Sequence, residues 1–101
     1  MVYSLPPNFF QPLIKKAIST INPQKIVLFG SFARGDQKEK SDIDLAFEFQ
    51  SSQENWVLFK SWIDDHFQTL RELDLVNLDE ADASIVESVK KEGIVIYERK
   101  N

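Results

Sequence analysis

With 101 residues, the chain has room for one domain, spanning residues 1–101, and for no second lobe. Hydrophobic residues make up 43% and charged residues 28%, which is ordinary for a globular protein and excludes a disordered one. The absence of cysteine and the single histidine exclude disulfides, thiolate chemistry and multi-histidine metal sites. The net charge of −4 argues against DNA or tRNA as the main partner, because surfaces that bind nucleic acid are usually basic.

The N-terminal sequence MVYSLPPNFF lacks the basic flank and the apolar run of a signal peptide. No apolar run in the sequence is long enough to span a bilayer. We therefore expect a cytoplasmic protein with no membrane partner and no direct nucleic-acid partner. A small anionic ligand or a protein is the favoured kind of partner.

The first predicted element is a helix from about Pro7 to Ile21, which ends at Asn22-Pro23. Its apolar stripe at helical spacing consists of Phe10, Ile14, Ala17, Ile18 and Ile21. Residues 25–29 follow as a short, β-branched apolar run that stops at Gly30. This run predicts a buried central strand.

Residues 42–49 alternate between apolar and mostly polar side chains with a period of two, which predicts a strand. One face carries Ile43, Leu45, Phe47 and Phe49, and the other carries Asp42, Asp44, Ala46 and Glu48. We expect the first face to pack on the core and the carboxylate face to stay open.

The second half of the chain predicts a helix over about residues 54–70, with apolar positions Trp56, Phe59, Ile63, Phe67 and Leu70. A strand over residues 73–78 comes next. It precedes a helix that Asp79 could cap, with Asp82 in its first turn. Lys90, Lys91 and Gly93 mark the end of that helix, and residues 94–97 form a last strand.

This order of elements predicts an α/β (α+β) fold with a small mixed β-sheet and helices packed mainly on one face. The glycine motifs of dinucleotide-binding and P-loop folds are absent from the sequence.

A glycine-rich turn follows the first predicted strand, in the string Gly-Ser-Phe-Ala-Arg-Gly. Gly30 permits close approach to the backbone, and Ser31 opens a helical turn whose N–H groups can hold a phosphate. Arg34, one turn later, is placed to pair with phosphate oxygens. For Arg34, the alternative is a plain surface residue of the short helix.

Asp42 and Asp44 stand two residues apart on one strand, so their carboxylates project from the same face. Their Cα atoms should lie roughly 6.5–7 Å apart, within reach of one or two Mg²⁺ ions. Carboxylates that close repel each other without a cation, which favours a metal site. Asp74 lies within an apolar strand sequence and would complete a three-carboxylate site if its strand neighbours that of Asp42. Its role would be to bind a second metal and activate an attacking hydroxyl; the alternative is an exposed acid on an edge strand.

With these residues, the chain resembles the DNA-polymerase-β-type nucleotidyltransferase superfamily, whose hallmark is Gly-Ser, a spacer, Asp-x-Asp or Asp-x-Glu, and a third carboxylate on a later strand. Its length and the strings GSFARG and SDIDL are similar to the minimal, MNT-type members. The resemblance implies a nucleotidyltransferase fold, ATP as substrate and two Mg²⁺ ions as cofactors. It implies catalytic and metal-binding roles for Asp42, Asp44 and Asp74, and nucleotide contacts by Gly30, Ser31, Arg34 and Ser41.

Members of this group commonly act as antitoxins of HEPN-domain proteins, and some transfer AMP to that partner. The resemblance therefore implies a magnesium-dependent protein adenylyltransferase that modifies a hydroxyl of a HEPN-type toxin, in a hetero-oligomer or a homodimer. The alternative is a non-enzymatic antitoxin that masks its HEPN partner. Three clustered acids favour the enzyme, because masking alone does not need them. Adenylylation of a drug would need a further lobe to hold the substrate.

Leu58 and Trp62 lie off the main apolar stripe of the predicted helix over residues 54–70. They widen its apolar face beyond what one small sheet needs. We therefore predict that this helix presents part of a protein interface, unless both side chains are buried in the core.

Overall fold

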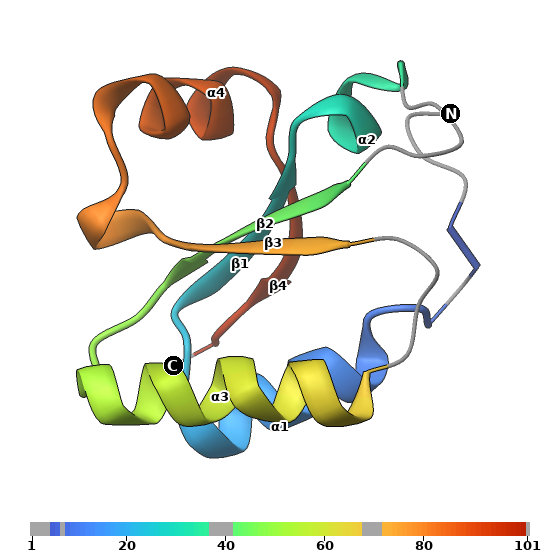
Figure 1. The fold of residues 1–101 in the computed structure, drawn as a ribbon. Helices are drawn as coiled ribbons and strands as arrows, with labels where there is room; N and C mark the ends of the chain where they lie inside the picture. Colours follow the sequence, from blue (N-terminus) through green and yellow to red (C-terminus); the bar gives the residue numbers. More distant parts are fainter. Residues whose placement is uncertain (1–4, 7, 37–41, 68–71, 101) are drawn as a thin grey trace.

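The computed structural model describes residues 5–6, 8–36, 42–67 and 72–100 (Figure 1). In chain order, its elements are α1 (Gln11–Thr20), β1 (Lys25–Phe29), α2 (Ser31–Arg34), β2 (Ile43–Glu48), α3 (Gln53–His66), β3 (Leu73–Asn77), the 3₁₀ helix η1 (Leu78–Glu80), α4 (Ala83–Glu92) and β4 (Ile94–Glu98). Each predicted strand is present, with bounds within one residue of the prediction. The helical turn expected after Gly30 is α2.

The strands form one mixed sheet in the order β3-β2-β1-β4. β2 pairs in parallel with β3, and β1 pairs antiparallel with both β2 and β4. α1 and α3 lie side by side along one face of this sheet, whereas α4 lies over the other face and α2 stands at the end of β1 (Figure 1). The structure confirms the predicted α/β fold with a small mixed sheet.

The main core lies between the sheet and the pair α1 and α3. Phe47 of β2 is fully buried there, and its ring centroid lies 5.4 Å from that of Trp56 and 5.3 Å from that of Phe59. These edge-to-face contacts between large aromatic side chains stabilise the packing of α3 on β2. α4, in contrast, buries no residue completely, so the helices that build the core share one face of the sheet.

The N-terminal helix differs from the prediction in its start and in its buried stripe. α1 begins at Gln11 because Asn8, with a φ of 65°, has a left-handed backbone that a helix cannot include. Leu13 is fully buried, whereas Ile18, which the predicted apolar stripe included, is 41% exposed and lies off the buried face. Since one residue turns an α-helix by about 100°, Ile18 lies a quarter-turn past the buried Ala17.

The carboxylate-bearing face of β2 is open only at its start. Ala46 on this face is fully buried, so the expectation of an open face along the whole strand was wrong. The reason is that α4 lies over this half of the sheet, where Val86 and Val89 line a small hollow together with Val27 of β1. The start of β2, where Asp44 lies, is the part left accessible.

α3 confirms the predicted apolar positions Trp56, Phe59 and Ile63, all buried. Its N-cap is Ser52, whose side chain accepts a hydrogen bond of 3.0 Å from the backbone N–H of Asn55. Leu70, also predicted for this helix, lies outside the described residues.

The cap of the last helix is Asp82, not Asp79. The Asp82 carboxylate accepts a hydrogen bond of 3.1 Å from the backbone N–H of Ile85, at the start of α4. Asp79 belongs to η1, because the side chain of Asn77 accepts its N–H at 3.0 Å and starts a separate turn. The predicted end of the helix is confirmed: Lys90 and Lys91 lie in the last turn and Gly93 follows.

Among the described residues, none of the helices combines the length and the apolar character that a membrane span requires.

Candidate active site

The turn that follows β1 is built on a glycine backbone. Gly30 has a φ of 77° and a ψ of −153°, a conformation that residues with a Cβ avoid. Its carbonyl accepts hydrogen bonds of 3.1 Å from the N–H groups of both Ala33 and Arg34, which closes α2 directly onto the strand end. Gly35, with a φ of 82°, ends the helix. This short helix therefore needs glycine on both sides.

Gly30 also makes room for a carboxylate. β1 and β2 pair so that Phe29 lies opposite Asp44. A Cβ at Gly30 would lie 2.2 Å from Oδ2 of Asp44, well inside any allowed contact. The close backbone approach that the sequence predicted at Gly30 is thus an approach to Asp44. Because Gly30 has no side chain, the carboxylate of Asp44 can lie directly beside the β1–α2 turn.

The parallel pairing of β2 and β3 brings two acids together. Asp44 of β2 and Asp74 of β3 are register partners, which confirms that the strand of Asp74 neighbours that of Asp44. Asp42 lies one residue before β2. Asp42 and Asp74 are exposed and Asp44 is half-buried, so the acidic groups are open to solvent on one side.

The electrostatics of Asp44 reflect this crowding. The pKa of its carboxyl is raised from 3.8 to about 6, mainly by burial and further by the charges of Asp74 and Asp42 and a hydrogen bond with Asp74. The positive charge of Arg34 opposes the rise. The site thus holds more negative charge than its surroundings stabilise.

Asp44→Asn should therefore stabilise the metal-free protein at neutral pH, by about 1 kcal/mol after allowance for solvent screening of this half-buried group. A carboxyl whose pKa rises on folding favours the folded state most when protonated, and this benefit is lost as the pH rises from about 4 through about 6. Urea unfolding in EDTA at pH 4 and pH 7.5 checks this. The free energy of unfolding of the asparagine variant should exceed that of the wild-type protein only at the higher pH. A variant that is equally stable or less stable at pH 7.5 would contradict the expected repulsion.

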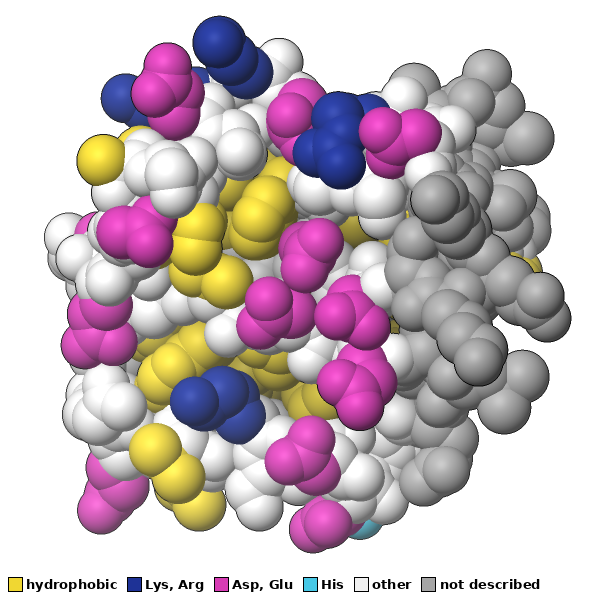
Figure 2. Space-filling view, turned by 45° about the horizontal axis from the view of Figure 1, so that its top comes forward, with side chains coloured by type: hydrophobic (Ala, Val, Ile, Leu, Met, Phe, Trp, Pro, Cys, Tyr) yellow, Lys and Arg dark blue, Asp and Glu magenta, His cyan; other side chains and the backbone are white. Residues whose placement is uncertain are grey.

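Figure 2 shows acidic side chains gathered in the middle of the face that α2 and α4 border. In the described part of the chain, no group of three acidic or histidine side chains lies close enough together to bind a metal ion as it stands. The donor chemistry nevertheless fits magnesium, because carboxylate oxygens are its preferred protein ligands. A cation would also relieve the repulsion that raises the pKa of Asp44. Asp42, Asp44 and Asp74 are the residues that could hold it.

Two of the remaining residues proposed from the sequence, Ser31 and Arg34, belong to α2. Ser31 is half-buried and is the first residue of α2. Arg34 is 47% exposed, and its guanidinium donates to Asp36 at 3.1 Å and to Glu92 at 2.7 Å. Ser41 lies outside the described residues. The contact with Glu92 was not predicted, because it depends on α4 packing beside α2, which no local sequence pattern indicates.

Comparison with known proteins agrees with this fold. Residues 11–101 match the family described as "Polymerase beta, Nucleotidyltransferase". The chain therefore belongs to the polymerase-beta nucleotidyltransferase family. The resemblance seen in its sequence is confirmed.

One curated relative is "Putative protein adenylyltransferase MJ1215" of Methanocaldococcus jannaschii, 38% identical over 47 residues. The match covers 46% of this chain and 52% of the relative, so the chain matches about half the length of that protein.

Two solved structures share the fold at 26% sequence identity. A toxin-antitoxin crystal structure with AMP-PNP superposes with a TM-score of 0.68, over 95% of this chain and 76% of the other. A mutant of the MntA-HpeT toxin-antitoxin superposes with a TM-score of 0.66, over 96% and 76% of the two chains.

Proposed function

We propose that this chain transfers AMP from ATP to a hydroxyl group of a partner protein, the HEPN-type toxin of a toxin–antitoxin pair. Family membership supports nucleotidyl transfer. The adenylyltransferase name of the archaeal relative supports AMP as the transferred group, and the toxin–antitoxin structures support a toxin partner. The observation that carries the proposal is the register of Asp44 beside Asp74, against the Gly30 backbone.

The triphosphate of ATP would lie on the β1–α2 turn. Gly30 lets the backbone approach the phosphates closely, and Ser31 and Arg34 supply donors to phosphate oxygens. Asp42, Asp44 and Asp74 would hold two magnesium ions. Magnesium, when bound, supplies positive charge that stabilises the attacking and leaving oxygens of an in-line displacement.

In the reaction, the acceptor hydroxyl oxygen attacks the α-phosphorus of ATP, and a new oxygen–phosphorus bond forms. The bond between the α-phosphorus and the oxygen that bridges it to the β-phosphorus breaks, so pyrophosphate leaves. A carboxylate oxygen of Asp74 takes the proton of the hydroxyl. This carboxylate is exposed, so it stays accessible to a large acceptor such as a protein.

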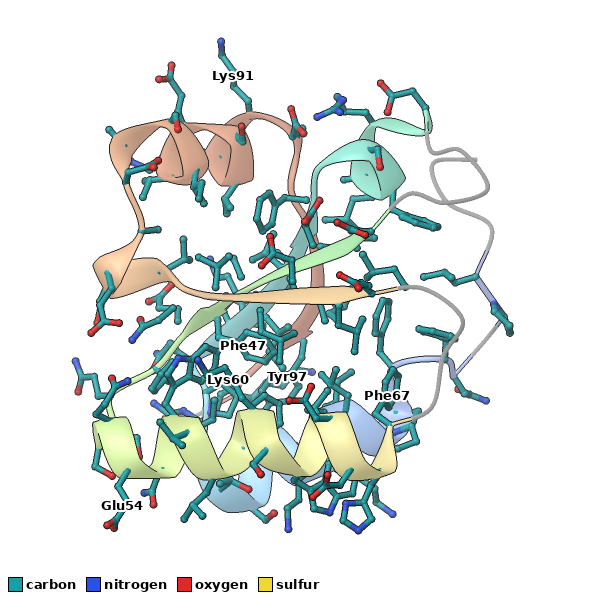
Figure 3. The ribbon with its side chains drawn as sticks, in the orientation of Figure 1. Phe47, Glu54, Lys60, Phe67, Lys91 and Tyr97 are labelled. Carbon is teal, nitrogen blue, oxygen red and sulfur yellow. The ribbon has the colours of Figure 1, made fainter. Side chains whose placement is uncertain are left out.

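A docking surface for the partner is predicted on α3, on the opposite side of the sheet from the acids. Leu58 is 57% exposed and Trp62 is half-buried. Full burial of both side chains would have excluded an interface on this helix, and neither is fully buried. Figure 3 shows Phe47 between the sheet and α3, whereas Glu54 points away from the core. Contact through this surface stays a prediction, and it is compatible with either transfer or masking.

ATP binding tests the nucleotide half of the proposal. Calorimetry with ATP and Mg²⁺ should show saturable binding by the wild-type protein. The double variant Asp42→Asn plus Asp44→Asn should bind at least about tenfold more weakly, because each charged hydrogen bond or ion contact contributes about 1.5–3 kcal/mol. A matched control is Asp64→Asn plus Asp65→Asn, which removes the same charge from exposed positions of α3. Equal ATP affinity of the wild-type protein and the first double variant would contradict the assigned site.

A further inference from the structure

The guanidinium of Arg34 is held by acids from two different parts of the chain. Its Nε donates to Asp36 at 3.1 Å, and its Nη1 donates to Glu92 at 2.7 Å. Asp36 lies two residues after Arg34, so this contact is local in the sequence. Glu92 is the last residue of α4, 58 positions away in sequence. The contact with Glu92 therefore fixes Arg34 relative to a separate element of the fold.

These two bonds leave Arg34 able to bind a further anion. A guanidinium carries five N–H donors in a planar arrangement, and the two bonds use one donor on Nε and one on Nη1. The positive charge of Arg34 also opposes the raised pKa of Asp44, so the two side chains lie within electrostatic range of each other. A guanidinium whose plane is already fixed loses less conformational entropy when a phosphate binds.

Glu92 is better suited than Asp36 to fix this orientation. Its side chain is only 22% exposed, whereas that of Asp36 is 60% exposed. The bond to Glu92 is also the shorter one, as expected for a charge-assisted pair with limited access of water. α4 thus presents its last carboxylate to the end of α2.

We infer that Glu92 is a positioning residue for ATP, which holds Arg34 in the orientation that receives the triphosphate. This inference rests on the proposed function, because it requires ATP on the β1–α2 turn. Glu92 acts only through Arg34 and touches neither ATP nor the acceptor. α4 therefore contributes to nucleotide binding through its last residue.

The test is a double-mutant cycle on ATP affinity with Glu92→Gln, Arg34→Ala and the combined variant. Glu92→Gln should raise the Kd for ATP about threefold to fivefold, the range expected for one partly exposed ion pair. It should leave the turnover at saturating ATP unchanged. In the Arg34→Ala background, the same change should have no further effect. Glu87→Gln, at an exposed position of the same helix, controls for the loss of one negative charge.

The outcomes separate this inference from the proposed function. An unchanged or lowered Kd in Glu92→Gln, with normal ATP binding by the wild-type protein, would overturn the positioning role alone. An equal loss of affinity on Glu92→Gln in both backgrounds would also overturn it, because Glu92 would then act independently of Arg34. Lack of ATP binding by the wild-type protein would overturn both the proposed function and this inference. Thermal unfolding of each variant shows whether a change in affinity reflects loss of the fold.

Discussion

Replacement of Gly30 with alanine should abolish nucleotide transfer. The new Cβ would lie 2.2 Å from Oδ2 of Asp44 and would push this carboxylate out of place. The backbone φ of 77° adds strain of order 1–3 kcal/mol for a residue with a side chain. Since a shift of about 1 Å in a catalytic group can cost roughly 100-fold in rate, we expect transfer to fall at least that far. Label transfer from [α-³²P]ATP measures the activity, and thermal unfolding measures the strain.

The matched control for this change is Gly35→Ala. Gly35 also has a positive φ, with φ 82° and ψ 14°, but this left-handed region strains alanine less than the Gly30 conformation does. The control variant should lose less stability than Gly30→Ala and keep most of its transfer activity. Similar activity in the two variants would show that the contact between Gly30 and Asp44 does not matter for transfer.

Asp74→Asn should abolish transfer while it leaves ATP affinity within a few-fold of the wild-type value. Asp42 and Asp44 would still anchor the metal–triphosphate complex, whereas Asp74 is proposed to serve the incoming hydroxyl. Loss of an interaction made mainly in the transition state lowers turnover rather than ground-state binding. We expect a loss of roughly 100-fold to 10,000-fold, the usual contribution of a general base. Calorimetry and label transfer on the same preparation measure the two quantities.

The Asp74 variant has two informative alternative results. Full transfer activity would remove Asp74 from the catalytic set, and its place in β3 would be that of an exposed acid on an edge strand. Loss of ATP binding would make it a ground-state ligand, equivalent in role to Asp42 and Asp44.

Most of the fold could be predicted from the sequence because its strands carry strong local patterns. The apolar run before Gly30 and the alternation from Ile43 onward fix two neighbouring strands. The spacing of Asp42 and Asp44 then places the acids on one face. The position of Asp74 beside Asp44 was predicted only as a condition, since strand order depends on contacts between distant segments. The structure meets that condition.

The errors arose where tertiary packing decides between equivalent local patterns. Ile18 and Leu13 both fit an apolar stripe, and only the direction of the core selects Leu13. Asp79 and Asp82 are both good capping residues, and the separate turn of η1 leaves Asp82 as the cap of α4. The pairing of Arg34 with Glu92 had no sequence signal, because it requires the exact approach of α2 and α4.

The acids beside Gly30 are proposed to catalyse the transfer of AMP from ATP to a partner protein. The most direct test incubates the wild-type protein and its Asp44→Asn variant with [α-³²P]ATP, Mg²⁺ and the protein encoded by the adjacent reading frame. We predict that the wild-type protein labels the partner, that EDTA prevents the labelling, and that the variant binds the partner but does not label it. Wild-type protein that binds and neutralises the partner without labelling it would contradict the account and would favour masking.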